Sequence, residues 1–209
     1  MAGVNLKFWQ GKKVFLTGHT GFKGSWMGAW LTRLGARVTG FSLAPDTTPS
    51  HFGLLPREYE SLEGDLRDLE ALRSALWRTN PDVVVHLAAQ SLVRASYVDP
   101  VGTYATNVMG TLHVLESIRK TPSVRVALMV TLDPVSAGQA PGNVRRLENY
   151  YLSTGIGSSI KTDNGFRGLV QNVDVSKRPG VDHVAMTTMP DLHRRIIADI
   201  AASSGIPCR

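Results

Sequence analysis

The sequence predicts an α/β protein with a doubly wound parallel sheet over residues 1–131. Two observations carry this prediction. Short apolar strand patterns alternate with helical patterns along this part of the chain, and closely spaced glycines stand where the first strand meets the first helix. Because a parallel strand must be reached by a crossover connection, such alternation places helices on both faces of one sheet.

The first repeat of strand and helix lies at residues 12–43. A strand pattern at 12–17 enters the glycine-rich turn, and residues 25–34 then carry apolar side chains at helical spacing. Gly35 ends this helix, and residues 37–43 restore a strand pattern before a turn rich in proline and threonine. The predicted order is therefore strand, turn, helix and strand.

The same pattern continues toward residue 131. A helix is predicted at 68–76, and the apolar run at 83–87 is typical of a strand that is covered on both faces. A further helix is predicted at 106–118 and a further buried strand at 124–131. These elements complete the first predicted domain.

Residues 132–209 are expected to form an unassigned tail that is less ordered than the preceding domain. Residues 136–142 are rich in turn formers, and 155–161 have the composition of a loop. Residues 169–175 could form one strand. An amphipathic helix is predicted at 191–202 from the spacing of its apolar residues, with a proline before it and a glycine after it.

Composition limits the class of protein. The chain has 209 residues, 43% of them apolar, which is typical of a globular protein. Its net charge is +6, but 23 basic and 17 acidic residues are interleaved, so no nucleic-acid partner is expected. The start of the chain lacks the apolar stretch of a secretory signal, and no apolar run is long enough to cross a membrane.

Cysteine and histidine usage bears on compartment and metal binding. Cys208 is the only cysteine, so no intramolecular disulfide and no cysteine-based metal site is expected, and a cytoplasmic location is predicted. His183 and His193 have no third ligand at a suitable spacing, so no metal site is predicted.

Three glycines give the first indication of chemistry. Gly18, Gly21 and Gly24 are spaced as Gly-x-x-Gly-x-x-Gly between the first strand and the first helix. There one glycine allows a tight turn, a second lets a pyrophosphate approach the backbone, and a third lets the helix pack closely on the strand. Such a turn could also be purely structural, but the strand before it and the helix after it favour a dinucleotide site.

Two more segments fit the same site. Asp65 could accept a hydrogen bond from an adenine amino group, although an acid at this place could also begin a helix. Residues 86–90 end a strand in small side chains, which would let a cofactor approach the carboxyl edge of the sheet. Close packing beneath a helix is the alternative reading of these small residues.

Five stretches of the chain resemble the extended short-chain dehydrogenase/reductase family. They are Phe8-Trp9-Gln10-Gly11-Lys12, Thr17-Gly18-His19-Thr20-Gly21-Phe22-Lys23-Gly24-Ser25-Trp26, Gly64-Asp65-Leu66-Arg67-Asp68, His86-Leu87-Ala88-Ala89-Gln90-Ser91-Leu92-Val93-Arg94 and Thr106-Asn107-Val108-Met109-Gly110-Thr111. The resemblance covers about residues 6–131. The second stretch is similar to that of the family's 4,6-dehydratases that act on CDP-glucose, and differs from those that act on dTDP- or GDP-sugars.

This resemblance implies a Rossmann-like domain that binds NAD, and a lyase that acts on a nucleotide sugar, CDP-glucose. Such enzymes oxidise the sugar at C4, eliminate water across C5 and C6, and return the hydride to C6. The resemblance also implies a homodimer through helices near residues 97–118. Val101, Tyr104, Val108 and Leu112 would then face either the partner or the sheet.

The resemblance also implies roles for single residues. The pyrophosphate would be held by Gly18, His19, Thr20, Gly21, Phe22, Lys23 and Gly24, the adenine by Asp65 and Leu66, and the middle of the cofactor by Leu87, Ala88, Ala89 and Gln90. Thr106 would lie near the same groove and Ser91 near the sugar. Many relatives have an acid at the end of the second strand, where this chain has Ser42 and Leu43, so this position does not distinguish NAD from NADP. NAD is expected because the reaction is redox-neutral overall and the close relatives use NAD.

The family pattern stops after Thr131. Relatives continue with Thr or Ser, then Asp, then Lys or Glu, and only the catalytic Asp133 is retained here. Relatives also place a lysine four residues after a tyrosine, where it lowers the tyrosine pKa so that the phenolate can take the C4 hydroxyl proton. The chain has five tyrosines, and none has a lysine at that spacing.

Two functions therefore remain open on the sequence. One is an NAD-binding, dehydratase-like protein whose catalytic half is truncated or altered, with little or no turnover. The other is a non-catalytic Rossmann module that binds NAD or a protein partner. A tyrosine and lysine pair in another reading frame of the gene beyond codon 131 would favour the first.

Overall fold

The computed structural model describes residues 6–56, 58–124, 128–132, 146–154, 158–162, 166–179 and 181. The chain divides into two compact units. The first unit is Leu6–Arg125, and the second unit is Val126–Arg209 together with Met1–Asn5.

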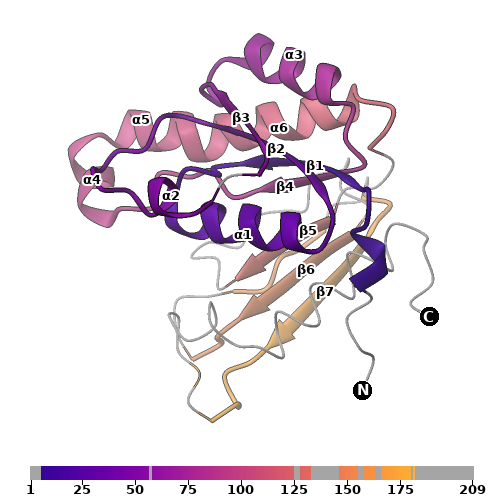
Figure 1. Cartoon of the computed structure of the whole chain (residues 1–209). Helices are drawn as coiled ribbons and strands as arrows, with labels where there is room; N and C mark the ends of the chain where they lie inside the picture. Colours follow the sequence, from indigo (N-terminus) through magenta and orange to yellow (C-terminus); the bar gives the residue numbers. More distant parts are fainter. Residues whose placement is uncertain are drawn as a thin grey trace. The chain divides into compact units, whose positions relative to one another are not determined.

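The first unit is built on a four-stranded parallel sheet. Its strands are β1 (Lys13–Thr17), β2 (Arg37–Ser42), β3 (Glu60–Glu63) and β4 (Val83–His86), in the order β3-β2-β1-β4. The register pairs Thr17, the last residue of β1, with Phe41 of β2 and with His86 of β4. The chain moves outward from β1 through β2 and β3, and then returns to the other side of β1 at β4 (Figure 1).

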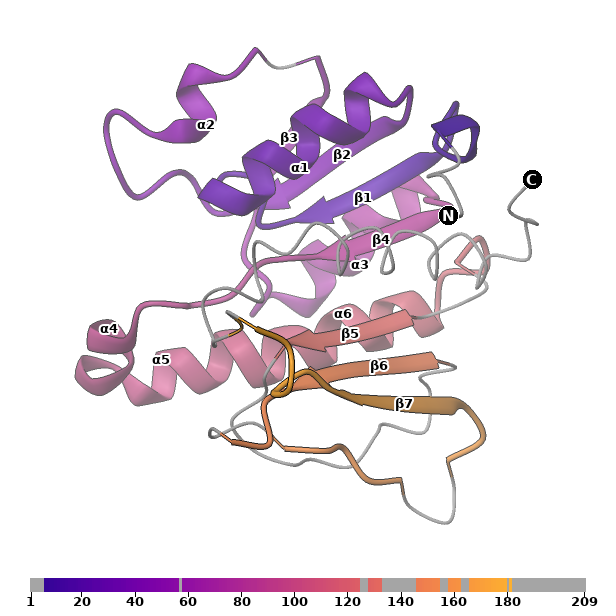
Figure 2. The ribbon, with the colours of Figure 1, turned by 90° about the horizontal axis from the view of Figure 1, so that it is seen from below.

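Helices cover both faces of this sheet, which confirms the predicted doubly wound fold. α1 (Phe22–Arg33) lies on one face, and α3 (Leu69–Thr79) and α6 (Gly110–Arg119) lie on the other (Figures 1 and 2). A short 3-10 helix, η1 (Leu6–Phe8), precedes β1, and α2 (His51–Leu54) follows β2.

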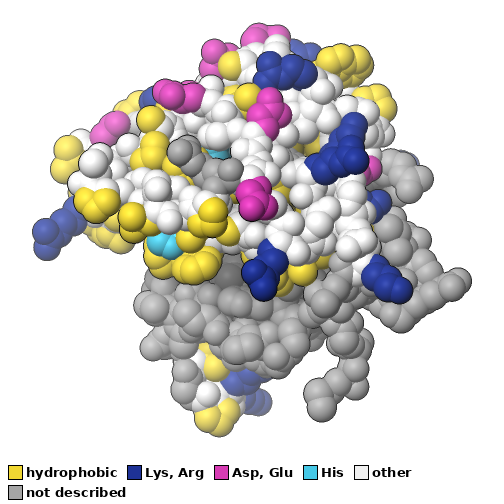
Figure 3. Space-filling view, in the orientation of Figure 1, with side chains coloured by type: hydrophobic (Ala, Val, Ile, Leu, Met, Phe, Trp, Pro, Cys, Tyr) yellow, Lys and Arg dark blue, Asp and Glu magenta, His cyan; other side chains and the backbone are white. Residues whose placement is uncertain are grey.

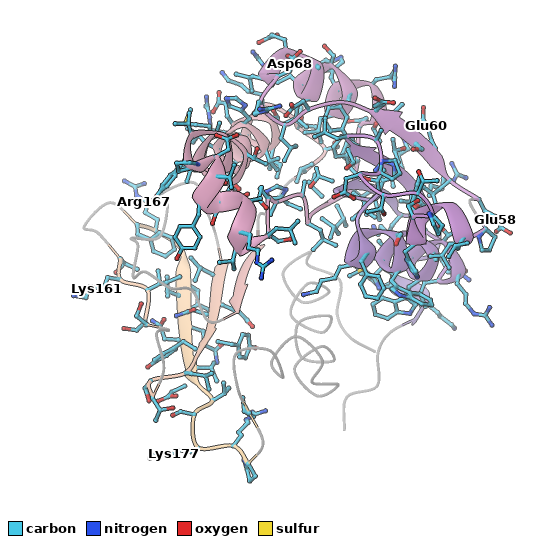
Figure 4. The ribbon with its side chains drawn as sticks, turned by 90° about the vertical axis from the view of Figure 1, so that its left-hand side faces the viewer. Glu58, Glu60, Asp68, Lys161, Arg167 and Lys177 are labelled. Carbon is cyan, nitrogen blue, oxygen red and sulfur yellow. The ribbon has the colours of Figure 1, made fainter. Side chains whose placement is uncertain are left out.

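The boundaries of α3 follow from local chemistry. The Asp68 carboxylate accepts a hydrogen bond from the amide of Ala71 at 3.0 Å and so caps the start of the helix (Figure 4). Asn80 ends it in the left-handed conformation with φ 46°, which asparagine tolerates better than most residues. The sequence predicted this helix at 68–76, and it continues three residues further.

A long helical stretch follows β4. It consists of α4 (Val93–Val98), α5 (Pro100–Tyr104), a π-helical turn η2 (Ala105–Met109) and α6. Asp99 caps α5, because its side chain accepts a hydrogen bond from the amide of Gly102 at 2.8 Å, and Pro100 stands where a missing N–H costs nothing. The predicted helix at 106–118 is thus confirmed, but the π turn inside it was not expected.

The core of the first unit joins the sheet to α3 and α6. Phe15 of β1 and Phe41 of β2 stack with ring centroids 5.8 Å apart, beneath Leu72 and Leu76 of α3 and Val114 of α6. The strand predicted at 83–87 to be covered on both faces is only partly buried as β4. Among the strands described in this sheet, β4 is the last, so it has a strand neighbour on one side only.

The second unit contains a parallel sheet of β5 (Leu128–Leu132), β6 (Arg146–Tyr151) and β7 (Leu169–Asp174), in that order. β5 and β7 confirm the strands predicted at 124–131 and 169–175, whereas β6 was not predicted. The segments predicted at 136–142 and 191–202 lie outside the described residues.

β6 and β7 carry an internal repeat. Asn149 pairs in register with Asn172, and its Nδ2 donates to Oδ1 of Asn172 at 2.8 Å. The hydroxyls of Ser153 and Ser176 lie 3.0 Å apart. Like side chains therefore stack on each other, and the members of each pair are 23 positions apart in the sequence. Lys161, Arg167 and Lys177 point outward from this unit (Figure 4).

Candidate functional site

The predicted glycine turn joins β1 to α1 and is very tight. Gly18 has φ +73°, which favours glycine, and a Cβ there would lie 2.6 Å from the amide nitrogen of Ala88. A Cβ on Gly24 would collide with the carbonyl oxygen of Gly18. These two glycines are therefore required by the fold, because each lets one piece of backbone approach another.

Gly21 stands in a different environment. It is the N-cap of α1 with φ −72° and ψ 166°, which any residue can adopt, and no side chain caps the helix there. The nearest atom to a Cβ at this position is the carbonyl oxygen of Gly18 at 3.4 Å, an ordinary contact. The fold itself does not demand a glycine here. The missing side chain leaves the start of a 12-residue helix open to a ligand.

The turn lies at the place where the strand order reverses. β1 and β4 are neighbours in the sheet: from β1 the chain passes to β2 on one side, and it returns to β4 on the other side of β1. In open α/β sheets, ligands bind outside the carboxyl ends of the strands at such a reversal. The contact of Gly18 with Ala88 shows that the two loops meet at this point.

The side chain of His19 points into the fold, so the predicted part of His19 in holding a pyrophosphate is left to its backbone and stays a prediction. It is fully buried, and its Nε2 lies 2.7 Å from the Ser61 hydroxyl of β3. The rings of Phe52 and Tyr59 pack edge-on against it at centroid distances of 5.1 and 6.2 Å. His19 therefore anchors the turn to the sheet.

The other residues of the turn remain candidates. The Thr20 hydroxyl donates to the carbonyl oxygen of Leu43 at 2.9 Å and lies 2.9 Å from the Ser42 hydroxyl, so it ties the turn to the end of β2. Phe22 and Lys23 are exposed on the first turn of α1. Hydrophobic side chains gather around a histidine over α1 and α2 (Figure 3), where Phe22 and Trp26 contact His51.

The two predicted adenine residues differ in their surroundings. The Leu66 side chain is buried in the core with Phe15 and Phe41, so the predicted contact of Leu66 with adenine is left to its backbone and stays a prediction. The Asp65 carboxylate accepts hydrogen bonds from the backbone amide of Arg67 at 2.9 Å and from its Nε at 2.8 Å. The Arg67 guanidinium thereby lowers the pKa of Asp65, which is ionised at neutral pH and can accept further bonds.

The segment after β4 lies beside the glycine turn. Leu87 and Ala89 are exposed, Ala88 is partly buried, and Ser91 is exposed next to them. The Gln90 side chain is engaged, since its Oε1 accepts from the amide of Leu92 at 2.6 Å and its Nε2 donates to the Thr103 hydroxyl at 3.2 Å. Thr106 lies in the π turn and is partly buried. Asp133, the one predicted catalytic residue, lies outside the described residues.

His86 stands at the centre of this region. Its Nδ1 lies 2.7 Å from the Thr17 hydroxyl, and its Nε2 lies 3.1 Å from the Thr111 hydroxyl. Burial lowers the pKa of His86 from its ordinary 6.5 to about 4, because the charged form loses its hydration. The imidazole is therefore neutral at physiological pH. From the sequence, His86 was noted only as the first residue of a segment that ends in small side chains, and no role was predicted for its ring.

This titration predicts a pH dependence of stability. Between pH 6.5 and about pH 4 the unfolded chain binds a proton at His86 that the folded chain does not bind. The free energy of unfolding should therefore decrease as the pH falls through this range, by on the order of 3 kcal/mol in total, and this contribution should level off below it. Urea denaturation of the wild type and of His86→Asn at several pH values measures the difference, and equal slopes in the two proteins would contradict the prediction.

No helix in the described part of the chain is long and apolar enough to cross a membrane. The described residues also contain no group of three or more His, Cys, Asp or Glu side chains that could hold a metal ion.

Known proteins are similar to this chain in sequence and in fold. A sequence profile of the family described as GDP-mannose 4,6 dehydratase matches residues 15–131. CDP-glucose 4,6-dehydratase of Salmonella typhimurium is 48% identical over 132 residues, which are 62% of this chain and 37% of that enzyme. The chain thus spans little more than a third of the length of that relative.

Solved structures agree with the fold. The UDP-glucose 4-epimerase of Thermotoga maritima, determined with UDP-glucose, is 26% identical with a TM-score of 0.51, over 58% of this chain and 38% of that one. The UDP-glucose 4-epimerase of Thermus thermophilus, in complex with NAD, is 22% identical with a TM-score of 0.51, over 93% of this chain and 52% of that one. At this identity the second likeness concerns the fold alone.

Proposed function

The chain belongs to the family described as GDP-mannose 4,6 dehydratase, within the extended short-chain dehydrogenases/reductases, and from this membership we propose that its first unit binds NAD. The glycine turn carries the proposal. Gly18 and Gly24 make the turn tight, while Gly21 leaves the start of α1 open where the fold itself would accept a side chain. The fold does not require this glycine, and it stands beside the amides at the start of a helix. This combination fits the binding of a pyrophosphate.

The remaining residues fit the same cofactor. Ala88 and Ala89 are small, so the nicotinamide half can lie close to the carboxyl ends of β1 and β4. Asp65 is ionised and can accept a hydrogen bond from the adenine amino group. When bound, NAD supplies a hydride acceptor, and the chain's own residues bind and orient it.

The proposed substrate is a nucleotide sugar, and CDP-glucose is the specific candidate. The identity of 48% with the Salmonella CDP-glucose 4,6-dehydratase supports this choice over other sugar nucleotides. Ser91 is exposed just beyond the small residues, where the sugar would lie. The proposed reaction class is dehydration, in which the sugar is oxidised at C4, loses water and is reduced at C6.

A non-catalytic role is the second candidate, and one observation favours it. None of the five tyrosines in the sequence is followed by lysine at the spacing that the reaction requires, and Leu132 and Pro134 flank the single retained aspartate. In this second candidate the chain binds NAD without turning over the sugar. Titration calorimetry of the full chain with NAD tests what both candidates share, and absence of binding heat together with an unchanged melting temperature would contradict both.

An apolar helical face supports a homodimer. Val101 is 79% exposed and Tyr104 is 70% exposed, and Val108 and Leu112 continue the same face along η2 and α6. All four side chains are more than half exposed, which leaves them available to a partner. Because an exposed apolar face of this extent is unusual in a monomer, we propose that a second copy of the chain covers it.

The double variant Val101→Glu/Tyr104→Glu is expected to separate the dimer. Two carboxylates buried without partners should weaken association by at least about 100-fold. Sedimentation equilibrium at several protein concentrations measures this effect. Leu54→Glu is the matched control, because Leu54 is also exposed, at 72%, but lies on α2. Dissociation by the control, or a dimer that survives the double variant, would contradict the proposed interface.

A further inference from the structure

The segment after β4, Leu87–Gln90, is held at its first end by the Thr17 hydroxyl. The oxygen of this hydroxyl accepts hydrogen bonds from the amides of Leu87 at 3.2 Å and of Ala88 at 3.4 Å. Thr17 is fully buried at the end of β1, one residue before Gly18. The position of this segment relative to the glycine turn therefore depends on where the Thr17 hydroxyl points.

Asn107 holds the other end of the segment. Its Oδ1 accepts from the amide of Gln90 at 2.7 Å, and its Nδ2 donates to the carbonyl oxygen of Gln90 at 2.8 Å. Both polar atoms of one carboxamide thus bind both backbone groups of one residue. Asn107 lies in the π turn η2, an irregularity that often marks functional places in helices.

His86 connects these two anchors, and the hydrogen bonds around it determine which atom donates and which accepts in each pair. The Thr111 hydroxyl donates to the carbonyl oxygen of Asn107 at 2.7 Å, so it can only accept from the imidazole. His86 therefore carries its proton on Nε2, and its bare Nδ1 accepts from Thr17. The Thr17 oxygen is then left as an acceptor for the two amides of the segment. All these bonds are satisfied together by one neutral tautomer.

The other states of the ring do not satisfy the same bonds. With a proton on Nδ1, the imidazole would present N–H to a Thr17 oxygen that already accepts from two amides. The lowered pKa of His86 agrees with the neutral form. Both ring nitrogens of His86 lie within hydrogen-bond distance of uncharged hydroxyls, those of Thr17 and Thr111.

We propose that Thr111 and His86 are positioning residues of the cofactor site. The Thr111 hydroxyl selects the tautomer of His86, and this tautomer holds the Thr17 and Asn107 anchors in one arrangement, which keeps the backbone of Leu87–Gln90 against the glycine turn. The inference rests on the proposed binding of NAD, since that segment would face the middle of the cofactor. It assigns to α6 a part in the site although none of its side chains needs to touch the ligand.

The test compares Thr111→Val with Thr111→Ser in the full chain. Valine removes the hydroxyl at nearly constant shape, so the amide NMR signals of Leu87, Ala88 and Gln90 should shift or broaden without NAD, and the Kd for NAD should rise about tenfold. Serine keeps the hydroxyl and should restore both. The ¹⁵N signals of the His86 ring should report one neutral tautomer in the wild type and a mixture in Thr111→Val.

Thr121→Val is the matched control. Thr121 follows the same helix and makes the same kind of bond, from its hydroxyl to the carbonyl oxygen of Ser117 at 2.8 Å, but it does not contact His86. This variant should leave the three amide signals and the Kd unchanged. The double variant Thr17→Val/Thr111→Val should weaken binding no more than the worse single variant, because both act through one imidazole.

Two outcomes would overturn the inference. One is a Thr111→Val protein whose three amide signals and imidazole tautomer match the wild type. The other is failure of Thr111→Ser to restore them. If the wild type does not bind NAD but the amide signals respond as expected, the proposed function fails and the positioning network stands, so the two failures are distinguishable.

Discussion

Gly21→Val is expected to abolish NAD binding and to leave the first unit folded. Valine tolerates the extended conformation of Gly21, and its Cβ would meet no atom closer than 3.4 Å. Its side chain would, however, stand over the open start of α1, where the pyrophosphate must approach the backbone. The Kd for NAD should rise at least about 100-fold, because both the close approach and the amide contacts are lost. Titration calorimetry measures this change, and a thermal melt checks the fold.

Gly24→Val provides the contrasting result. Its Cβ would collide with the carbonyl oxygen of Gly18, so this variant should lose thermal stability as well as binding. Gly21→Ala should fall between wild type and Gly21→Val in affinity, at unchanged stability. An intact Gly21→Val protein that binds NAD as tightly as the wild type would contradict the assignment of this turn.

The second large effect concerns turnover. The 209-residue chain, supplied with NAD and CDP-glucose, is expected to form 4-keto-6-deoxy product at least about a thousandfold more slowly than an ordinary enzyme. Without a lysine beside a tyrosine, no phenolate is available at neutral pH to take the C4 proton. Leu132 and Pro134 supply neither acid nor base for the elimination. Mass spectrometry of the sugar nucleotide detects the loss of water.

Two further measurements make this result informative. Absorbance of reduced nicotinamide reports whether oxidation at C4 occurs without elimination. Binding of NAD without either signal would favour the non-catalytic candidate. Product formed at about 1 per second or faster would contradict this prediction. It would show that the chain supplies an acid and a base other than a tyrosine with a lysine four residues later.

Local patterns predicted the first unit well because they reflect local causes. The strand at β1, the helix at α1 and the cap of α3 at Asp68 follow from side-chain period, glycine position and one short-range hydrogen bond. The same reasoning missed β6, because Arg146–Tyr151 mixes charged, polar and aromatic residues. Only its in-register pairing with β7 makes the 23-residue repeat of Asn149 and Asn172 visible.

The motifs did not predict which of their side chains are buried, because burial depends on distant parts of the chain. His19 belongs to the glycine motif, yet it bonds to Ser61, 42 residues away, and packs beneath Phe52. Leu66 follows a candidate adenine ligand, yet its side chain fills the core beside Val114. A motif identifies the backbone of a site, but it does not show which of its side chains turn inward.

By itself the sequence determined the parallel α/β fold of the first unit and the place of the glycine turn, since each follows from residue identity at a fixed spacing. It also shows that none of its five tyrosines has a lysine four residues later. Only the tertiary structure shows that the fold requires glycine at positions 18 and 24 but not at position 21. It also decided the tautomer of His86, because Thr17 and Thr111 meet the two nitrogens of that ring from positions 69 residues before it and 25 after it in the sequence. Hydrogen-bond direction is a property of atoms that meet in space, and no spacing along the chain encodes it.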